Sequence, residues 1–157
     1  MLTSELEADP IPDASKFETI SLSELTSKGL APEPDPQHPV VLVVDDERVI
    51  ADTLGMILRN NGFAPIIAYS GKSALAIAQV IPPDLLISDV LMPGISGIEL
   101  AIKLKSQAPD CRVLLFSGQA AAKDLLAQAR CNGHQFNVLA KPVHPDELLT
   151  QLAQLAA

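Results

Sequence analysis

The sequence contains few residues that cross-link a chain or hold a structural metal. Among its 157 residues there are only two cysteines. Cys111 and Cys131 lack the paired C-x-x-C spacing of zinc sites, so we expect neither a structural zinc nor a disulfide framework, and a reducing compartment fits best. A domain of this length buries roughly two-thirds of its unfolded surface, which sustains a core without cross-links. We therefore expect one globular domain.

The sequence also lacks a targeting segment and a membrane span. Its first ten residues, MLTSELEADP, carry acids where a signal peptide carries bases. No apolar run approaches the roughly 18 residues that a transmembrane helix needs. We expect a cytoplasmic protein with no membrane partner.

Basic residues are scarce, and the shortage is concentrated at the amino terminus. The formal net charge is −8, of which residues 1–39 contribute −6 (eight acids, two lysines) and residues 40–157 contribute −2 (eleven acids, nine bases). Six of the 13 prolines also fall within 1–39. We predict a flexible acidic, Pro-rich extension over 1–39, with a helical pattern at 17–30, and a folded domain over 40–157. The domain has no basic patch for nucleic acid.

From residue 40 onward, short apolar runs alternate five times with amphipathic stretches. This alternation is typical of parallel βα units, and the continuously apolar runs are typical of buried parallel strands. We predict an α/β fold, a doubly wound (βα)5 domain around a five-stranded parallel sheet. The expected strands are Val40–Val44, Ala64–Tyr69, Leu85–Ser88, Arg112–Phe116 and Phe136–Ala140.

Residues typical of helix ends agree with this alternation. Ser70 and Ser96 precede the second and third helical patterns as N-caps, and Pro145 stands at the first position of the last. Asp45 or Asp46 is a candidate N-cap for the first helix.

Polar residues follow four of the predicted strands. Because the carboxyl ends of parallel strands lie on one edge of a sheet, we expect these side chains to lie close together. Carboxylates suit Mg²⁺, and a lysine with a hydroxyl suits a phosphoryl group. The residues concerned are Asp45, Asp46 and Glu47 after the first strand, Ser88 and Asp89 at the third, Ser117 at the fourth and Lys141 at the fifth.

Asp89 is the candidate nucleophile, because it stands alone at the end of the central strand. The turn residues Pro93 and Gly94 follow it, and we expect them to let the backbone approach the site. Glu47 is better explained as an exposed acid in the first turn of a helix than as a metal ligand.

Four motifs occur in order within residues 40–157: VVLVVDDE, PDLLISDVLMPGISGIEL, LLFSG and LAKP. In this order and spacing the sequence resembles the receiver domain of two-component response regulators. The resemblance implies a flavodoxin-like fold of the single-domain, chemotaxis-regulator type. It also implies a signalling switch that accepts a phosphoryl group from a histidine kinase or phosphotransfer protein, and not a turnover enzyme.

The resemblance assigns a role to each matching residue. Asp89 would be phosphorylated, Ser117 would be the hydroxyl that moves toward the phosphoryl group, and Lys141 would be its counter-ion. Asp46, Asp89 and the backbone carbonyl of Leu91 would bind Mg²⁺, with Asp45 acting through metal-bound water. The Lys141–Pro142 peptide bond would be cis.

The sequence departs from the family at the position three residues before the lysine, where Val138 replaces a frequent aromatic. Phe136 lies on the same predicted strand, two residues earlier. Activation is therefore expected to be transmitted differently, through the region 118–137. Leu91 and Gln119 occupy the positions that flank the path of the hydrolytic water in the family, and the apolar Leu91 predicts slow self-dephosphorylation.

Two other functions fit parts of this pattern. A phosphatase of the haloacid dehalogenase type also uses an aspartyl nucleophile with Mg²⁺, but it needs an acid two residues later, where this chain has Leu91. A pseudo-receiver that binds partners without phosphorylation would not need the complete set of acids, serine and lysine. The sequence shows no output domain after the last leucine-rich stripe, so we expect output through contact with an unknown downstream protein.

Overall fold

The computed structural model describes residues 38–118 and 120–156 of the chain, so residues 1–37 of the predicted extension, with the helical pattern at 17–30, lie outside the described part. Five parallel strands form one sheet in the order β2-β1-β3-β4-β5, which confirms the predicted doubly wound fold. The strands are β1 (Val40–Val44), β2 (Ala64–Ala68), β3 (Leu85–Asp89), β4 (Arg112–Ser117) and β5 (Asn137–Ala140).

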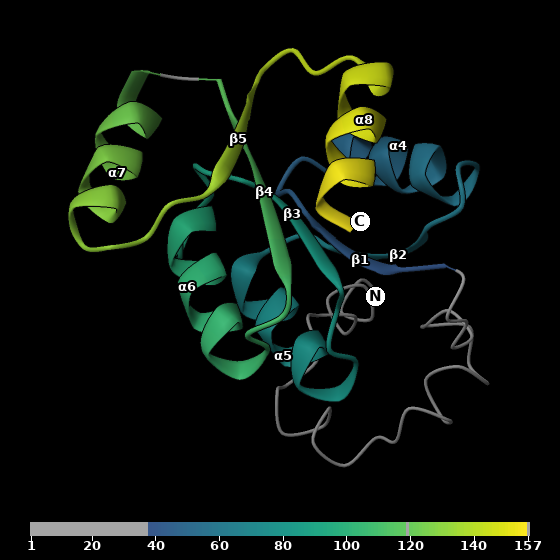
Figure 1. Cartoon of the computed structure of the whole chain (residues 1–157), viewed down its shortest axis with the longest axis horizontal. Helices are drawn as coiled ribbons and strands as arrows, with labels where there is room; N and C mark the ends of the chain where they lie inside the picture. Colours follow the sequence, from purple (N-terminus) through teal and green to yellow (C-terminus); the bar gives the residue numbers. More distant parts are fainter. Residues whose placement is uncertain (1–37, 119, 157) are drawn as a thin grey trace, which may run out of the picture.

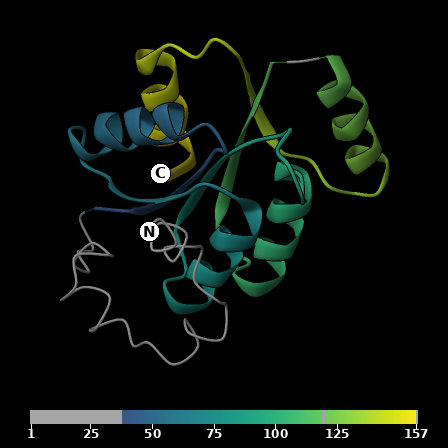
Figure 2. The same ribbon diagram turned by 180° about the vertical axis from the view of Figure 1, so that it is seen from behind.

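Helices cover both faces of this sheet, as Figures 1 and 2 show. α4 and α8 pack on one face, and α5, α6 and α7 on the other. None of the helices in the described ranges is long and apolar enough to cross a bilayer. Their bounds are α4 (Arg48–Arg59), α5 (Gly71–Val80), α6 (Gly97–Gln107), α7 (Ala120–Cys131) and α8 (Pro145–Ala156).

The core divides into two clusters separated by the sheet. Leu58 of α4 and Leu148 of α8 pack on the cluster that contains Val43, whereas Leu104 of α6 packs on the cluster that contains Leu42. Because successive strand residues point to opposite faces, both faces of a central strand must be apolar. This is why VVLVV is a continuous apolar run, and its predicted bounds are those observed.

Three of the predicted helix ends are confirmed. The Ser70 and Ser96 hydroxyls each accept a hydrogen bond from the backbone N–H three residues later, at 3.1 Å, and α8 begins at Pro145. The prediction that Asp45 or Asp46 caps α4 is wrong, because the N-cap position is Glu47, which makes no side-chain capping bond.

The fifth strand begins one residue later than predicted. Phe136 precedes β5, is half-buried, and stacks on the His134 ring with a centroid separation of 6.4 Å. Its apolar character comes from packing against the α5–α6–α7 side of the core and not from a place in the strand.

The two cysteines occupy opposite environments. Cys111 is buried beside β4, and burial raises the pKa of its thiol to about 11. Cys131, the last residue of α7, is exposed, and both thiols are free. Only the ionised thiolate is an effective nucleophile, so the two residues should differ sharply in reactivity.

We expect one fast-reacting thiol per folded chain when the protein is treated with a disulfide reagent at pH 8. At that pH only about one Cys111 thiol in 10³ is ionised, and the side chain is also shielded from the reagent. Replacing Cys131 with serine should remove the fast phase, and replacing Cys111 with serine should leave it. A second equivalent that reacts at the same rate before denaturant is added would contradict the burial of Cys111.

Candidate functional site

The polar residues that follow the strands lie together at one edge of the sheet, as predicted. Asp45 directly follows β1, Asp89 ends β3, Ser117 ends β4 and Lys141 directly follows β5. The strand register aligns them: Asp89 is paired with Phe116, one residue before Ser117, and Ser117 is paired with Ala140. Residues from four different parts of the sequence therefore lie together at the carboxyl-terminal edge of the sheet.

An ion pair joins the carboxyl ends of β3 and β5. The Lys141 Nζ atom lies 2.9 Å from Asp89 Oδ2, and the two side chains are 26% and 13% exposed. The lysine stem passes Gly118, where an added Cβ would lie 3.1 to 3.5 Å from three of its carbons. A small residue at 118 thus leaves room for the lysine to reach Asp89. The Lys141–Pro142 bond is cis, which confirms that prediction.

Two further carboxylates lie beside this ion pair. Oxygens of Asp45, Asp46 and Asp89 all lie within 4.8 Å of one another. Asp45 is 1% exposed and its Oδ1 accepts a hydrogen bond from the Glu47 backbone N–H at 2.9 Å. Its Oδ2 is the one buried side-chain nitrogen or oxygen in the described ranges that has no hydrogen-bond partner. Asp46 is exposed to solvent.

The electrostatics of the cluster favour a cation. Burial raises the pKa of the Asp45 carboxyl, the Asp89 and Asp46 charges raise it further, and the Glu47 N–H bond and Lys141 oppose the shift without cancelling it. Burial works to lower the pKa of Lys141, but its hydrogen bond to Asp89 and the surrounding negative charges outweigh that effect and raise it. The single positive charge of Lys141 therefore does not neutralise the negative charge of the three carboxylates.

These residues fit Mg²⁺. Magnesium prefers oxygen ligands and is commonly held by one or two carboxylates together with water and phosphate. A buried carboxylate oxygen without a donor is costly unless an ion or water satisfies it, and Asp45 Oδ2 is such an oxygen. Three carboxylates against one ammonium leave two negative charges, which a divalent cation balances.

The remaining predicted residues lie around the cluster. Ser117 is half-buried at the end of β4. Glu47 is exposed, as predicted, but it stands at the N-cap position of α4 and not in the first turn of the helix. Leu91 is half-buried, packs against the core, and its backbone N–H donates to Asp89 Oδ1 at 3.4 Å. The structure brings these residues together, and their individual roles stay predictions.

The close approach of backbone to the site occurs at a residue that sequence reasoning did not single out. Gly94 has a φ of +82°, which explains the glycine in the turn, but nothing lies near its Cβ position. At Gly97 an added Cβ would collide with the Asp89 carbonyl oxygen. The sequence hint for this role of Gly97 was its position at the start of a predicted helix, in ISGIEL.

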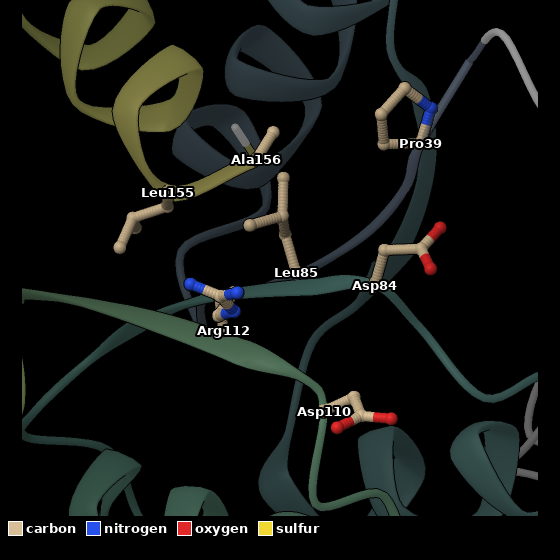
Figure 3. Close-up of a pocket in the computed structure, with 7 residues that line it drawn as sticks. All are labelled: Pro39, Asp84, Leu85, Asp110, Arg112, Leu155 and Ala156. Atoms are coloured by element: carbon tan, nitrogen blue, oxygen red, sulfur yellow. The ribbon is translucent and has the colours of Figure 1, made fainter.

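The described part of the chain also contains a pocket at the opposite end of the sheet. It has a volume of about 360 Å³ and lies where the chain enters β3 and β4 (Figure 3). Arg112 and Asp110 come from the amino end of β4, far along the strand from Ser117. This pocket is therefore separate from the acidic cluster.

Comparison with known proteins decides the family. The family model described as the response regulator receiver domain matches residues 41–153. The chain belongs to the response regulator receiver domain family. This membership favours a receiver domain over a phosphatase of the haloacid dehalogenase type.

The receiver domain is similar to several curated and solved proteins. It is 36% identical over 121 residues to the probable transcriptional regulatory protein TcrX of Mycobacterium tuberculosis, covering 77% of this chain and 51% of TcrX. It is 30% identical over 115 residues to the response regulator MprA of Mycobacterium avium, covering 73% and 50%. The chain thus spans about half the length of these relatives.

Solved structures show the same fold. The chemotaxis protein CheY4 of Vibrio cholerae superposes with a TM-score of 0.67 at 28% identity, over 75% of this chain and 98% of that one. The response regulator TrrA of Thermotoga maritima, described in complex with Mg²⁺ and BeF, superposes with a TM-score of 0.65 at 29% identity, over 74% and 98%.

Replacing Asp45 with asparagine should stabilise the metal-free receiver domain and weaken its response to Mg²⁺. The substitution removes a buried charge from a repulsive cluster, so we expect a gain of about 1 kcal/mol in the free energy of unfolding. Wild type should gain stability on adding Mg²⁺ through linkage, and the variant should gain much less. Thermal unfolding with and without Mg²⁺ measures both effects.

Asp110→Asn is the matched control, because Asp110 is an exposed carboxylate at the other end of the sheet. It should leave the Mg²⁺ response of the wild type intact. An Asp45→Asn protein that is less stable without metal, and that responds to Mg²⁺ as wild type does, would show that Asp45 is not part of a metal site.

Proposed function

We propose that this receiver domain is a phosphorylation switch in which Asp89 accepts a phosphoryl group from the phosphohistidine of a histidine kinase or phosphotransfer protein. The observation that carries the proposal is the 2.9 Å ion pair between Lys141 and Asp89, set within a cluster of three carboxylates. A carboxylate that is partly exposed, held by an ammonium and flanked by candidate metal ligands is placed to act as a nucleophile.

In the transfer, the phosphorus–nitrogen bond of the donor breaks and a phosphorus–oxygen bond to the Asp89 carboxylate forms. Lys141 already lies against Asp89, so it can shift to an oxygen of the incoming phosphoryl group and neutralise part of its charge. Ser117 is the last residue of the neighbouring strand β4, and its hydroxyl would donate a hydrogen bond to another phosphoryl oxygen. Lys141 and Ser117 together would then report phosphorylation to the segments that follow them.

Asp46, Asp89 and the Leu91 carbonyl would hold Mg²⁺, with Asp45 acting through metal-bound water. When bound, the ion supplies charge neutralisation for the carboxylates and the phosphoryl group. The buried, unpartnered Asp45 Oδ2 supports this assignment, as does the description of the related TrrA in complex with Mg²⁺ and BeF.

Output by contact with a downstream protein is the second part of the proposal. The segment after Ser117 leads into α7 and β5, where Val138 is 39% exposed in place of an aromatic. Leu126, Phe136 and Val138 line a pocket of about 490 Å³ between these elements. We propose that the domain acts as a phosphoacceptor and not as a turnover enzyme, in the cytoplasm and without nucleic acid or membrane as a partner.

Asp89→Asn should abolish phosphorylation by acetyl phosphate in the presence of Mg²⁺, because the amide is not a nucleophile at this position. Intact mass or a phosphate-affinity gel measures the yield. Asp52→Asn is the control, since Asp52 is an exposed acid on α4 whose carboxylate accepts a hydrogen bond from Tyr69. Undiminished yield in Asp89→Asn would defeat the assignment, and no phosphorylation of wild type by any phosphodonor would favour a pseudo-receiver.

Leu91→Asn should shorten the lifetime of the phosphorylated state. Leucine cannot orient an attacking water, whereas an amide can, and a well-aligned polar group accelerates such a step by up to roughly 10²-fold. The decay of phosphoprotein after donor removal gives the rate. Gln119→Ala, at a position outside the described residues, should change it little. A much slower decay in Gln119→Ala would instead make the glutamine the residue that sets the lifetime.

A further inference from the structure

One buried polar side chain of β3 has no part in the function proposed so far. Ser88 is 0% exposed and lies on the face of the sheet where Leu86 and Val90 contribute to the apolar core beneath α5 and α6. A hydroxyl in such a place costs free energy unless it is hydrogen-bonded. Its Oγ atom donates to the carbonyl oxygen of Asp89 at 2.9 Å. The bond therefore falls on the backbone of the proposed phosphoacceptor.

Gly97, the first residue of α6, lies against the same Asp89 carbonyl. An added Cβ at Gly97 would collide with the Asp89 carbonyl oxygen and would lie 2.9 Å from Ser88 Oγ. The Gly97 backbone N–H donates to the Val90 carbonyl at 2.8 Å. The peptide that follows Asp89 is thus enclosed between the serine hydroxyl and the backbone of α6.

The orientation of this peptide determines where two site groups lie. The Val90 N–H donates to Phe116 at 3.0 Å, and the Leu91 N–H reaches Asp89 Oδ1 at 3.4 Å. A rotation of the Asp89–Val90 peptide would break the Val90 bond to the Phe116 carbonyl and shift the adjoining backbone, which carries the Asp89 carboxylate on one side and leads to the Leu91 carbonyl on the other. Mutating a group that orients a metal ligand typically lowers metal affinity by roughly 10- to 100-fold.

We propose that Ser88 is a positioning residue, whose buried hydroxyl fixes the Asp89 carbonyl and so holds the Asp89 carboxylate and the Leu91 carbonyl in place for Mg²⁺. This inference rests on the proposed function of Asp89. The proposal requires a hydroxyl at position 88, and not merely a small side chain. If Ser88 were present only because Gly97 leaves little room, alanine would serve equally well.

Ser88→Ala tests this directly, because it removes the hydroxyl and adds no volume. We expect the Mg²⁺ concentration that half-saturates the protein to rise by about tenfold. A Mg²⁺ titration of the metal-free protein, followed through the Leu91 amide signal in NMR spectra, measures this without any phosphoryl donor. The Mg²⁺ concentration for half-maximal phosphorylation by acetyl phosphate should rise by a similar factor.

Ile87→Val is the matched control, since Ile87 is a buried residue of the same strand that packs on the other face of the sheet. It should lower stability modestly and leave both Mg²⁺ dependences unchanged. Equal Mg²⁺ dependence in Ser88→Ala and wild type would overturn the positioning role, as would an equal shift in Ile87→Val. Failure of wild type to be phosphorylated would instead overturn the proposed function, so the two failures are distinguishable.

Discussion

The central constraint on this receiver domain is the repulsion among three carboxylates that the sheet brings to one place. Asp45, Asp46 and Asp89 have oxygens within 4.8 Å of one another, and only Lys141 among the site residues offsets their charge. Asp45 is also buried with one oxygen unpartnered. Such a cluster destabilises the metal-free fold, but it forms a site complementary to a divalent cation and a phosphoryl group.

The rest of the architecture holds the cluster together. Apolar strands buried on both faces form a rigid sheet, and rigid elements position functional groups more accurately than loops do. The adaptations near the site are small. Gly118 leaves space for the lysine stem, and Gly97 lets α6 approach the Asp89 carbonyl beside the Ser88 hydroxyl. Each glycine contacts its site residue from a different part of the sequence, so the site depends on backbone packing as much as on charged side chains.

The sequence was sufficient to predict the sheet, because its strands are continuous apolar runs that end in polar residues. The rule that parallel strands end at a common edge then predicted which side chains gather there. The limits of β5 were less clear, because Phe136 is apolar for reasons of core packing and stacking on His134. The capping role expected of Asp45 or Asp46 was wrong because both side chains belong to the carboxylate cluster, and Asp45 accepts the Glu47 N–H from there. Ser88 was named among the polar residues at this edge but given no role, and Gly97 was missed, because a single hydrogen bond and a single close approach leave no periodic pattern in a sequence.

The most direct test of this account is ¹⁹F NMR of beryllofluoride, a mimic of the phosphoryl group, added to the metal-free receiver domain with and without Mg²⁺. We expect bound fluorine signals only when Mg²⁺ is present together with beryllofluoride, because the repulsive carboxylates must be neutralised before an anion can approach Asp89. Bound signals of equal intensity without Mg²⁺, or none with it, would contradict the claim that the carboxylate cluster and Lys141 form one metal-dependent phosphoryl site.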